Sequence, residues 1–431
     1  MSLNQFVAGI LNINPEVIED LFEVPQSDES ILIKLKLRVK PAECPYCKGP
    51  VTIHGYTKKK LVHSVLANRK CTIVFLRRRY MCSACCISFS EPNPFSNTSE
   101  NITHETKINI LKDLKNPGET YTIIASRYNV SPQSVIRIFD KHVNIPRKPL
   151  PEVLSIDEHY FPNSNYASLY CTLLMDFKTG ELIDVLPDRK KIIVTKYLTD
   201  IKLHTRDIMT LKSELDNVKY VSMDLYDNFR DIFRNMIPQA VICADSFHVI
   251  KHLTEDFDQV RKSSARSTEN EVLKRLLLKF RFVFNHNIYL DNEARYNRSL
   301  GRYVNYRQIR DIMFDNFPKL EAAYNLKELY IIYNATKNLE EAAAKFDVIK
   351  QYFVDSRIDE YDEFITLMTN WKQEIINSFT KIDGRRINNS YIESKNRQLE
   401  HLMNNANGYT NFQRTRNRIL YCLNKRDTFL F

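Results

Sequence analysis

The stretch VLSIDEHYF, residues 153 to 161, carries an acidic residue in the middle of a run with the composition of a buried β-strand. Successive side chains of a strand point to opposite faces, so Asp157 shares one face with Ser155 and His159. A carboxylate on an otherwise apolar strand is costly to bury unless a positive group neutralises it. A metal ion supplies such a group, and Asp157 is therefore a candidate metal ligand.

Two further acids have related surroundings. Asp224 lies in YVSMDLYDNF, residues 220 to 229, where it shares a strand face with Ser222. Glu393 lies in NNSYIESKN, residues 388 to 396, where an asparagine-rich turn leads into a helix. Each acid taken alone is more often a solvated residue. Together, two acids from neighbouring strands and one from a helix can hold two divalent cations about 4 Å apart, an arrangement that supports phosphoryl transfer.

The chain around these acids divides into regions of different composition. Strand-like and helical segments alternate after residue 151, which predicts an α/β fold, and nearly continuous helical spacing follows. The predicted domains are an N-terminal zinc-binding module (1–95), a helix-turn-helix domain with its linker (96–150), the first part of a catalytic core (151–260), a helical insertion (261–384), and the second part of the core with a basic C-terminal helix (385–431).

The bulk composition narrows the class of protein. The 431 residues are 43% apolar and 26% charged, which is typical of a soluble globular protein. A net charge of +10 favours a polyanionic partner such as nucleic acid, because phosphates attract lysine and arginine. No apolar stretch approaches the roughly 20 residues that span a bilayer, and the N-terminal stretch lacks the basic start of a signal peptide. We therefore expect a cytoplasmic protein whose nine cysteines are thiols or metal ligands.

Two C-x-x-C pairs, CPYC and CSAC, are separated by 34 residues. The strands VTIHGY and CTIVFLRRRYM cross between them, as in a zinc ribbon. Two such turns can present four thiolates tetrahedrally to one structural zinc ion. Cys86 competes for the last ligand position, and Cys71 is expected to be buried. The predicted zinc ligands are Cys44, Cys47, Cys82 and Cys85.

A helix-turn-helix is predicted in YTIIASRYNVSPQSVIRIFDKHV, residues 121 to 143. Ser131 is a favourable N-cap for the second helix, and Pro132 stands at its first position, where the missing N–H costs nothing. The alternative is an αα-hairpin that only packs in the core. In the DNA-binding interpretation, three residues of the second helix face outward: Gln133, Ser134 and Arg137.

The order of these motifs resembles that of DDE-type insertion-sequence transposases, and most of all those of the ISL-three family. The resemblance covers nearly the whole chain and rests on CPYC…CSAC, the helix-turn-helix, SIDEHY, VSMDLYDNF, ADSFHVIKHL, NNSYIESKNRQL and GYTNFQRTRNRIL. It implies an RNase H-like catalytic core in which Asp157, Asp224 and Glu393 bind two catalytic Mg²⁺ ions, which Mn²⁺ can replace. Ser390 and Ser394 stand where the family commonly has glycine.

The resemblance also implies a function: binding of the terminal inverted repeats of an insertion sequence, followed by metal-dependent DNA strand cleavage and strand transfer. The implied partners are double-stranded DNA, at the element ends and at the target, and a second copy of the chain, at least on DNA. The implied location is a bacterial cytoplasm, with nucleoid association when DNA is bound. The alternatives are a catalytically inactive, transposase-derived DNA-binding regulator and an RNase H-type nuclease unconnected with transposition.

Several residues near the three acids have roles that stay open. Asp245 and Asp227 are alternatives to Asp224 as the second acid, although the family motif favours Asp224. His248 either orients the scissile phosphate or caps a helix, and Trp371 is either a core residue or a stacking partner for a flipped base. Four basic residues flank the glutamate and are expected to contact DNA phosphates: Arg385, Arg386, Lys395 and Arg397.

Overall fold

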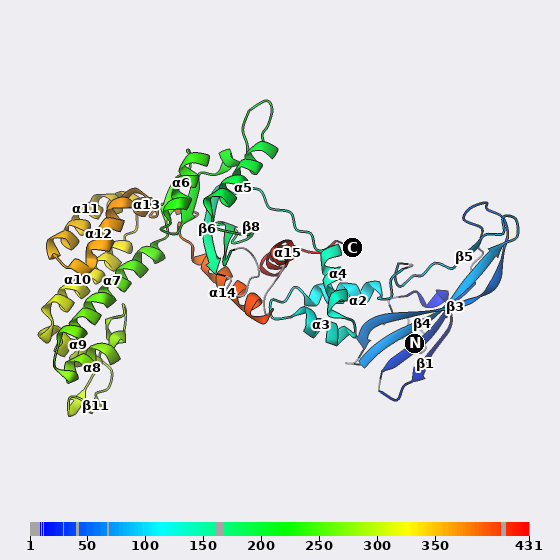
Figure 1. The fold of residues 1–431 in the computed structure, drawn as a ribbon, viewed down its shortest axis with the longest axis horizontal. Coiled ribbons are helices and arrows are strands. Elements are labelled where there is room, and N and C mark those ends of the chain that lie inside the picture. Colours follow the sequence, from blue (N-terminus) through cyan, green and yellow to red (C-terminus); the bar gives the residue numbers. More distant parts are fainter. Residues whose placement is uncertain are drawn as a thin grey trace. The chain divides into compact units, whose positions relative to one another are not determined.

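The computed structural model forms two compact units, Met1–Pro146 with Gln398–Phe431, and Arg147–Arg397 (Figure 1). Residue 161 of the opening motif and residues 408–410 of the last family motif lie outside the described residues. The structure describes Gly9, Leu11 and residues 13–28, 30–39, 43–66, 69–97, 99–160, 168–406 and 411–430.

The first unit begins with a sheet whose central strands run between the two cysteine pairs. β3 and β4 form a long antiparallel ribbon, as the sequence predicts, and the sheet order is β1-β2-β4-β3 with β5 on β4. Cys71 is buried on β4, which confirms that expectation. The strands are β1 (Ile18–Pro25), β2 (Ile31–Leu37), β3 (Val51–Leu66), β4 (Arg69–Cys82) and β5 (Ser88–Ser90).

Three helices follow this sheet, and the C-terminal helix packs against them. The Tyr421 hydroxyl donates a hydrogen bond to the Leu111 carbonyl oxygen at 2.7 Å, and its ring lies 6.0 Å from that of Phe139. Arg418 is buried and donates to the Glu119 carbonyl oxygen at 2.9 Å. The helices are α2 (His104–Asp113), α3 (Tyr121–Tyr128), α4 (Pro132–His142) and α15 (Phe412–Leu423).

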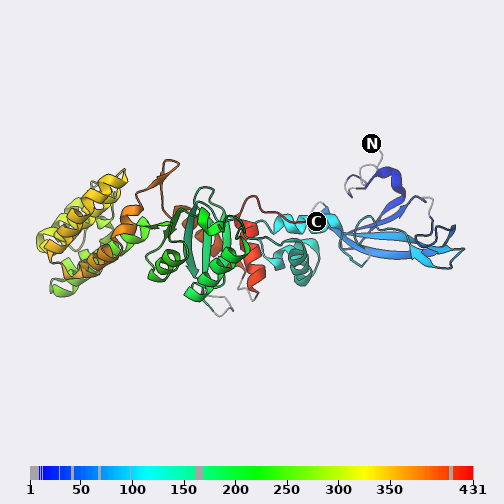
Figure 2. The ribbon, with the colours of Figure 1, turned by 90° about the horizontal axis from the view of Figure 1, so that it is seen from above.

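The second unit contains a five-stranded mixed sheet of order β10-β9-β6-β7-β8. β6, β7 and β8 are antiparallel neighbours, whereas β9 and β10 run parallel to β6. This topology, with helices packed on the sheet, fits an RNase H-like core and confirms the predicted α/β fold; Figure 2 gives a second view. The elements are β6 (Val153–Tyr160), β7 (Tyr170–Asp176), β8 (Leu182–Leu186), α5 (Lys191–His204), β9 (Tyr220–Met223), α6 (Asp227–Met236) and β10 (Val241–Ala244).

A helical region with its own hydrophobic core follows β10 in the same unit. Trp371 is only 4% exposed and belongs to this core, as the core interpretation predicts. No helix in the described ranges is long and apolar enough to cross a membrane. The elements are α7 (Ser246–Ser267), α8 (Glu271–Lys279), η3 (Arg281–Phe284), β11 (Arg295–Asn297), β12 (Arg302–Val304), α9 (Tyr306–Asn316), α10 (Pro318–Asn334), α11 (Leu339–Ser356), α12 (Asp362–Asn370) and α13 (Lys372–Asn377).

The chain then returns to the sheet through α13 and a short hairpin. The Asn377 amide donates to the Ile242 carbonyl oxygen on β10 at 2.8 Å, which ties α13 to the edge strand. Asp383 and Gly384 turn the hairpin, and both have positive φ values of 50° and 75°, as a tight two-residue turn requires. The remaining elements are β13 (Lys381–Ile382), β14 (Arg385–Arg386) and α14 (Ser390–Asn405).

Arg386 fastens this hairpin to the helical region. Its guanidinium donates to the Ser378 carbonyl oxygen at 2.9 Å and to the Ser378 hydroxyl at 2.8 Å. It also donates to the Asn334 carbonyl oxygen at 2.5 Å and lies 3.6 Å from the ring centroid of Phe379. Burial lowers the pKa of Arg386. These contacts hold the segment that leads into α14.

We predict that Arg386→Ala lowers the free energy of unfolding by about 2–3 kcal/mol, because the substitution leaves buried acceptors without a donor. Chemical denaturation followed by the fluorescence of Trp371, the single tryptophan, measures the change. The control Arg266→Ala removes an exposed arginine of α7 and should shift stability by less than about 0.5 kcal/mol. Equal stability of the two variants would contradict the fastening role.

Candidate active site and metal centres

Asp157 lies within β6 and is 4% exposed. One carboxylate oxygen accepts a hydrogen bond from the backbone N–H of Glu158 at 2.8 Å, and the other accepts one from the Asn396 amide. Burial, followed by the negative charge of Asp224, raises the pKa of Asp157 to about 8. The carboxyl group is thus held where its charged form is unfavourable unless a cation approaches.

Asp224 approaches Asp157 because of the strand register. Ser155 of β6 pairs with Ser222 of β9 in a parallel ladder. Each acid lies two residues beyond its serine, on the same face, so the two carboxylates reach the same edge of the sheet. Their side chains interact directly, and this contact also raises the pKa of Asp157. The sequence predicts the two acids as a pair, and the structure brings them together.

Asp245 and His248 join the same cluster from the end of β10. Asp245 is 1% exposed and caps α7 by accepting a hydrogen bond from the backbone N–H of Phe247. His248 Nδ1 lies 2.9 Å from an Asp224 oxygen and 3.1 Å from an Asp245 oxygen. Burial lowers the pKa of His248, but its hydrogen bonds to the two acids outweigh this effect and raise the pKa to about 10. The two carboxylates thus favour the protonated form of His248, and Asp245 is the residue that caps the helix.

Glu393 lies in the first turn of α14, within electrostatic range of this cluster. Its backbone N–H donates to the Asn389 carbonyl oxygen at 3.0 Å, which starts the helix at this point. Burial and the negative charge of Asp245 raise the pKa of Glu393, while the His248 charge lowers it. Glu393 therefore lies within electrostatic reach of the acids, although it is separated from them by the whole helical region.

Asn389 and Asn396 hold the cluster together and were not singled out from the sequence. Asn389 is fully buried; its backbone N–H donates to Asp245 at 3.3 Å, and its side-chain amide donates to the Ile156 carbonyl oxygen at 3.1 Å and to Asp224 at 3.5 Å. Asn396 donates to Asp157. The only sequence signal for these two residues was the asparagine-rich composition around Glu393. Their hydrogen-bond partners are remote in the sequence, so no local pattern connects them to the acids.

The match to a known protein family identifies the family of this chain. Residues 154–419 match the family model of the DDE transposases of the ISL-three type, whose description is "Transposase". The chain belongs to the ISL-three family of DDE transposases. The match includes both strand acids, Asp245 with His248, and the glutamate of α14. A comparison with curated proteins gives no match.

The donor set of this transposase fits a hard divalent cation such as Mg²⁺, which prefers oxygen ligands. In the described residues, no lysine or arginine forms an ion pair with Asp157 or Asp224. The side-chain oxygens of Asn389 and Asn396 are buried and have no hydrogen-bond partner among these residues. Ligand atoms of Asp224, Asp245 and His248 lie within 4.8 Å of one another, a group that does not include Asp157 or Glu393.

The basic residues beside Glu393 have different surroundings. Arg397 is exposed, and its charge acts on Glu393. Lys395 is half-buried. Arg385 lies between the rings of Phe177 and Tyr391, with its guanidinium 4.7 Å and 4.8 Å from the two centroids. Arg386 donates to protein acceptors, as described above, and this geometry favours a structural role over the expected phosphate contact.

The four predicted zinc ligands of the transposase form one cluster. Their sulfur atoms lie within 4.8 Å of one another; Cys44 and Cys85 are 3.6 Å apart, and Cys47 and Cys82 are 3.4 Å apart. Tetrahedral thiolates at a Zn–S distance of about 2.3 Å are separated by about 3.8 Å, so the cluster could hold zinc. Cys86 is exposed and lies outside this group.

The two knuckles of this cluster have the same local geometry. The backbone N–H of Lys48 donates to the Cys44 carbonyl oxygen at 2.9 Å, and that of Cys86 donates to Cys82 at 3.0 Å. Lys48 and Cys86 both have positive φ values, 60° and 55°. Hydrogen bonding from the backbone N–H of Cys85 lowers the pKa of Cys82 to about 6, which favours the thiolate that a metal requires.

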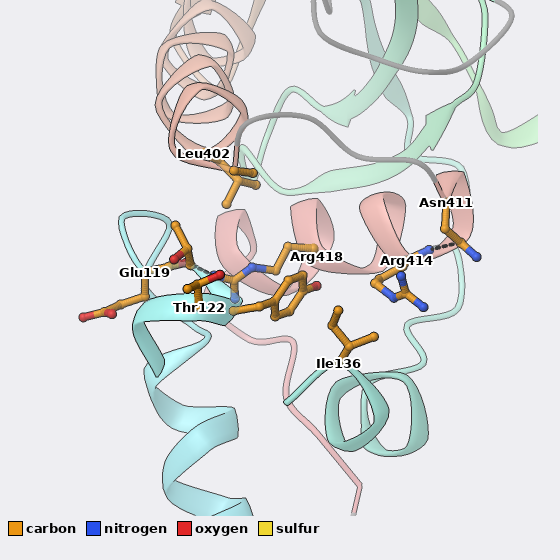
Figure 3. Close-up of a pocket in the computed structure, with 10 residues that line it drawn as sticks. Glu119, Thr122, Ile136, Leu402, Asn411, Arg414 and Arg418 are labelled. Carbon is orange, nitrogen blue, oxygen red and sulfur yellow. Dashed lines mark hydrogen bonds between the residues drawn. The ribbon is translucent and has the colours of Figure 1, made fainter. Parts of the chain in front are cut away.

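The helix pair α3 and α4 has the capping that the sequence predicts. The Ser131 hydroxyl accepts a hydrogen bond from the backbone N–H of Ser134 at 3.1 Å, and Asn129 ends α3 in the left-handed conformation. Gln133 and Arg137 are exposed on α4. α15 packs against the pair, and a cavity of about 190 Å³ beside these helices is lined by Ile136, Leu402 and Arg414 (Figure 3).

We predict that Cys82→Ser abolishes zinc binding, because three thiolates and a hydroxyl leave the tetrahedral site incomplete. The purified wild-type chain should carry one zinc ion, measured by elemental analysis. Cys86→Ser is the matched control and should keep the metal, since Cys86 lies outside the cluster. Zinc loss in the Cys86 variant but not in the Cys82 variant would show that Cys86 is the ligand.

We predict that Mg²⁺ raises the melting temperature of the wild-type chain, because an ion that binds only the folded state stabilises it by about 2.7 kcal/mol at a hundredfold excess over Kd. Asp157→Asn should raise the melting temperature without Mg²⁺, because it removes a carboxyl group whose ionised form is disfavoured by burial and by Asp224. The variant should also lose most of the response to Mg²⁺. Asp231→Asn, on the exposed face of α6, should behave as wild type. An undiminished Mg²⁺ response in Asp157→Asn would contradict the site.

Proposed function

We propose that this transposase binds the terminal inverted repeats of an insertion sequence and catalyses strand cleavage and strand transfer at the carboxylate cluster. The observation that carries the proposal is the meeting of Asp157 and Asp224, on adjacent parallel strands, with Glu393 at the start of α14. In this assignment Asp157, Asp224 and Glu393 would hold two Mg²⁺ ions, which would activate water and stabilise the leaving oxygen. Mn²⁺ can replace Mg²⁺ because it accepts the same oxygen ligands.

When bound, these ions lower the pKa of a water molecule and stabilise the leaving oxygen of a phosphodiester. The protein's part is to hold the reacting groups in place. Asn396 orients Asp157, and Asn389 fixes Asp224 and Asp245 relative to the strand end. The imidazolium of His248 adds a positive charge beside the acids, where a scissile phosphate carries negative charge.

The chemistry proceeds in two displacements at phosphorus. The oxygen of water attacks the phosphodiester at the element end, the bond from phosphorus to the 3′-oxygen breaks, and a 3′-hydroxyl and a 5′-phosphate result. The 3′-hydroxyl then attacks a phosphodiester of target DNA and displaces the 3′-oxygen of that strand, so one bond forms for each that breaks. No covalent bond between protein and DNA is required.

DNA recognition is assigned to the first unit and to the flank of Glu393. Gln133 and Arg137, which are exposed on α4, and Ser134 at its start are the proposed DNA contacts of a helix-turn-helix. Near the acids, Arg385, Lys395 and Arg397 are the proposed phosphate contacts. The joining of two ends needs two active sites, so we include a homodimer on DNA in the proposal.

A catalytically inactive regulator is the alternative function. It would need the first unit but no buried, repelling carboxylates, which destabilise a fold that does not use them. The contact between Asp157 and Asp224, with Glu393 within electrostatic reach of Asp224, therefore supports the enzyme.

We predict that Glu393→Gln, Asp157→Asn and Asp224→Asn each reduce Mg²⁺-dependent nicking of DNA that carries the element ends by at least about a thousandfold. The control is Asp227→Asn, an exposed acid paired with Arg230, which should keep activity within about twofold. Nicking is measured on a labelled duplex of the flanking and terminal repeat sequence. Full activity in Glu393→Gln would remove the assignment, and absence of nicking by the wild-type chain would favour the regulator.

A further inference from the structure

The segment from α8 to α9 concentrates positive charge on the helical region. Residues 272–310 contain nine lysines and arginines but only two acids. Some of these cations have acidic partners, as Arg307 has in Asp291. Five are exposed, and their side chains form neither an ion pair nor a hydrogen bond with any residue that the structure describes: Lys279, Arg281, Arg295, Arg298 and Arg302. Such a set of cations, with so few acids beside it, matches a polyanionic partner.

Exposed aromatic rings accompany these cations on the hairpin of β11 and β12. Tyr296 and Tyr303 face each other across the hairpin, with centroids 5.5 Å apart and planes at 64°. They are 57% and 70% exposed, so neither ring is used by the hydrophobic core. Figure 1 shows the hairpin, labelled β11, beside α8 and α9. Aromatic rings that alternate with arginines provide stacking platforms for nucleic-acid bases.

A cavity of about 570 Å³ adjoins the hairpin. This volume lies in the range of about 300–1,000 Å³ that is usual for small-ligand pockets. Its lining contains no aspartate or glutamate. Three cations, Lys279, Arg295 and Arg298, contribute to it, together with the amide side chains of Asn292 and Asn297. Phe280, Phe282, Tyr296 and Tyr306 supply aromatic surface.

We propose that this hairpin and cavity bind an unpaired segment of a DNA strand. The five exposed cations contact its phosphates, and the tyrosine rings stack on its bases. The side-chain N–H groups of Asn297 donate to base edges, while its oxygen accepts from the backbone N–H groups of Ser299 and Leu300. Stacking distinguishes a single strand from a duplex, because base faces are covered inside a helix. The inference rests on the proposed function, since a strand opened at a cleaved element end is the DNA that this site would receive.

The test compares full-length variants by fluorescence anisotropy with labelled oligothymidine and with a duplex, in buffer without divalent cations so that no strand is cut. Combining Arg298→Glu with Tyr303→Ala should weaken oligothymidine binding at least about fivefold, because one stacked ring is removed. The slope of log affinity against log salt should also become shallower by about 0.7, because one phosphate is no longer neutralised by an arginine. Lys337→Glu, an equal charge change in the loop before α11, should leave both values unchanged.

Wild-type affinity for oligothymidine in the double variant would overturn the proposal. An equal loss of duplex and single-strand affinity would also overturn the proposal, because the site would then bind phosphates without contacting the bases. Unchanged Trp371 fluorescence and melting temperature show that the variant is folded. Photo-crosslinking of a strand with 5-iodouracil gives a second measurement: crosslinks should map to Tyr296 or Tyr303, and crosslinks confined to other segments would contradict the site.

The same samples separate this inference from the proposed function. If the wild-type chain fails to nick terminal-repeat DNA with Mg²⁺ while the oligothymidine results hold, the proposed function fails and the strand-binding site stands. If nicking occurs but the double variant binds oligothymidine normally, the strand-binding site fails and the proposed function stands.

Discussion

The surroundings of the candidate site are constrained by the repulsion between two carboxylates that adjacent strands bring to the same edge of a sheet. Asp157 is almost completely buried, and its pKa of about 8 expresses how poorly the protein alone supports a second negative charge beside Asp224. Two groups offset part of this repulsion. Backbone and amide N–H groups donate hydrogen bonds to Asp157, and the ring of His248 lies against Asp224. A bound cation would offset this repulsion, which is consistent with the divalent metals that the family suggests.

Glu393 lies near the two aspartates although it is remote from them in the sequence. A complete helical region with its own core separates β10 from Glu393. α13 is tied to β10 through Asn377, and Arg386 fastens the following hairpin by three hydrogen bonds. Asn389 then links the start of α14 to the strand end and to two of the acids. The position of Glu393 therefore depends on contacts whose purpose is structural, and the helical region is part of the active site's scaffold.

Local patterns predicted much of this architecture. Alternation along β6 and β9 placed both aspartates on one face, the C-x-x-C spacing identified four sulfur atoms that cluster, and the Ser131 cap marked the start of α4. What escaped prediction depends on partners remote in sequence. His248 could be weighed only as a phosphate contact or a cap, and its bridge between two acids required β9 and β10 to be neighbours. Arg418 belongs to a basic helix that suggests a solvated face, yet its guanidinium is buried against backbone carbonyls of the first unit.

The central claim is that Asp157, Asp224 and Glu393 ligate the same pair of divalent cations. Anomalous diffraction from crystals of the full chain soaked with Mn²⁺ tests this most directly, because the ions themselves are located. The account predicts two peaks at the strand edge, each within about 2.2 Å of carboxylate oxygens, with Asp157 shared and Glu393 bound to one ion. Peaks confined to Asp245 and His248, with Glu393 unliganded, would contradict it.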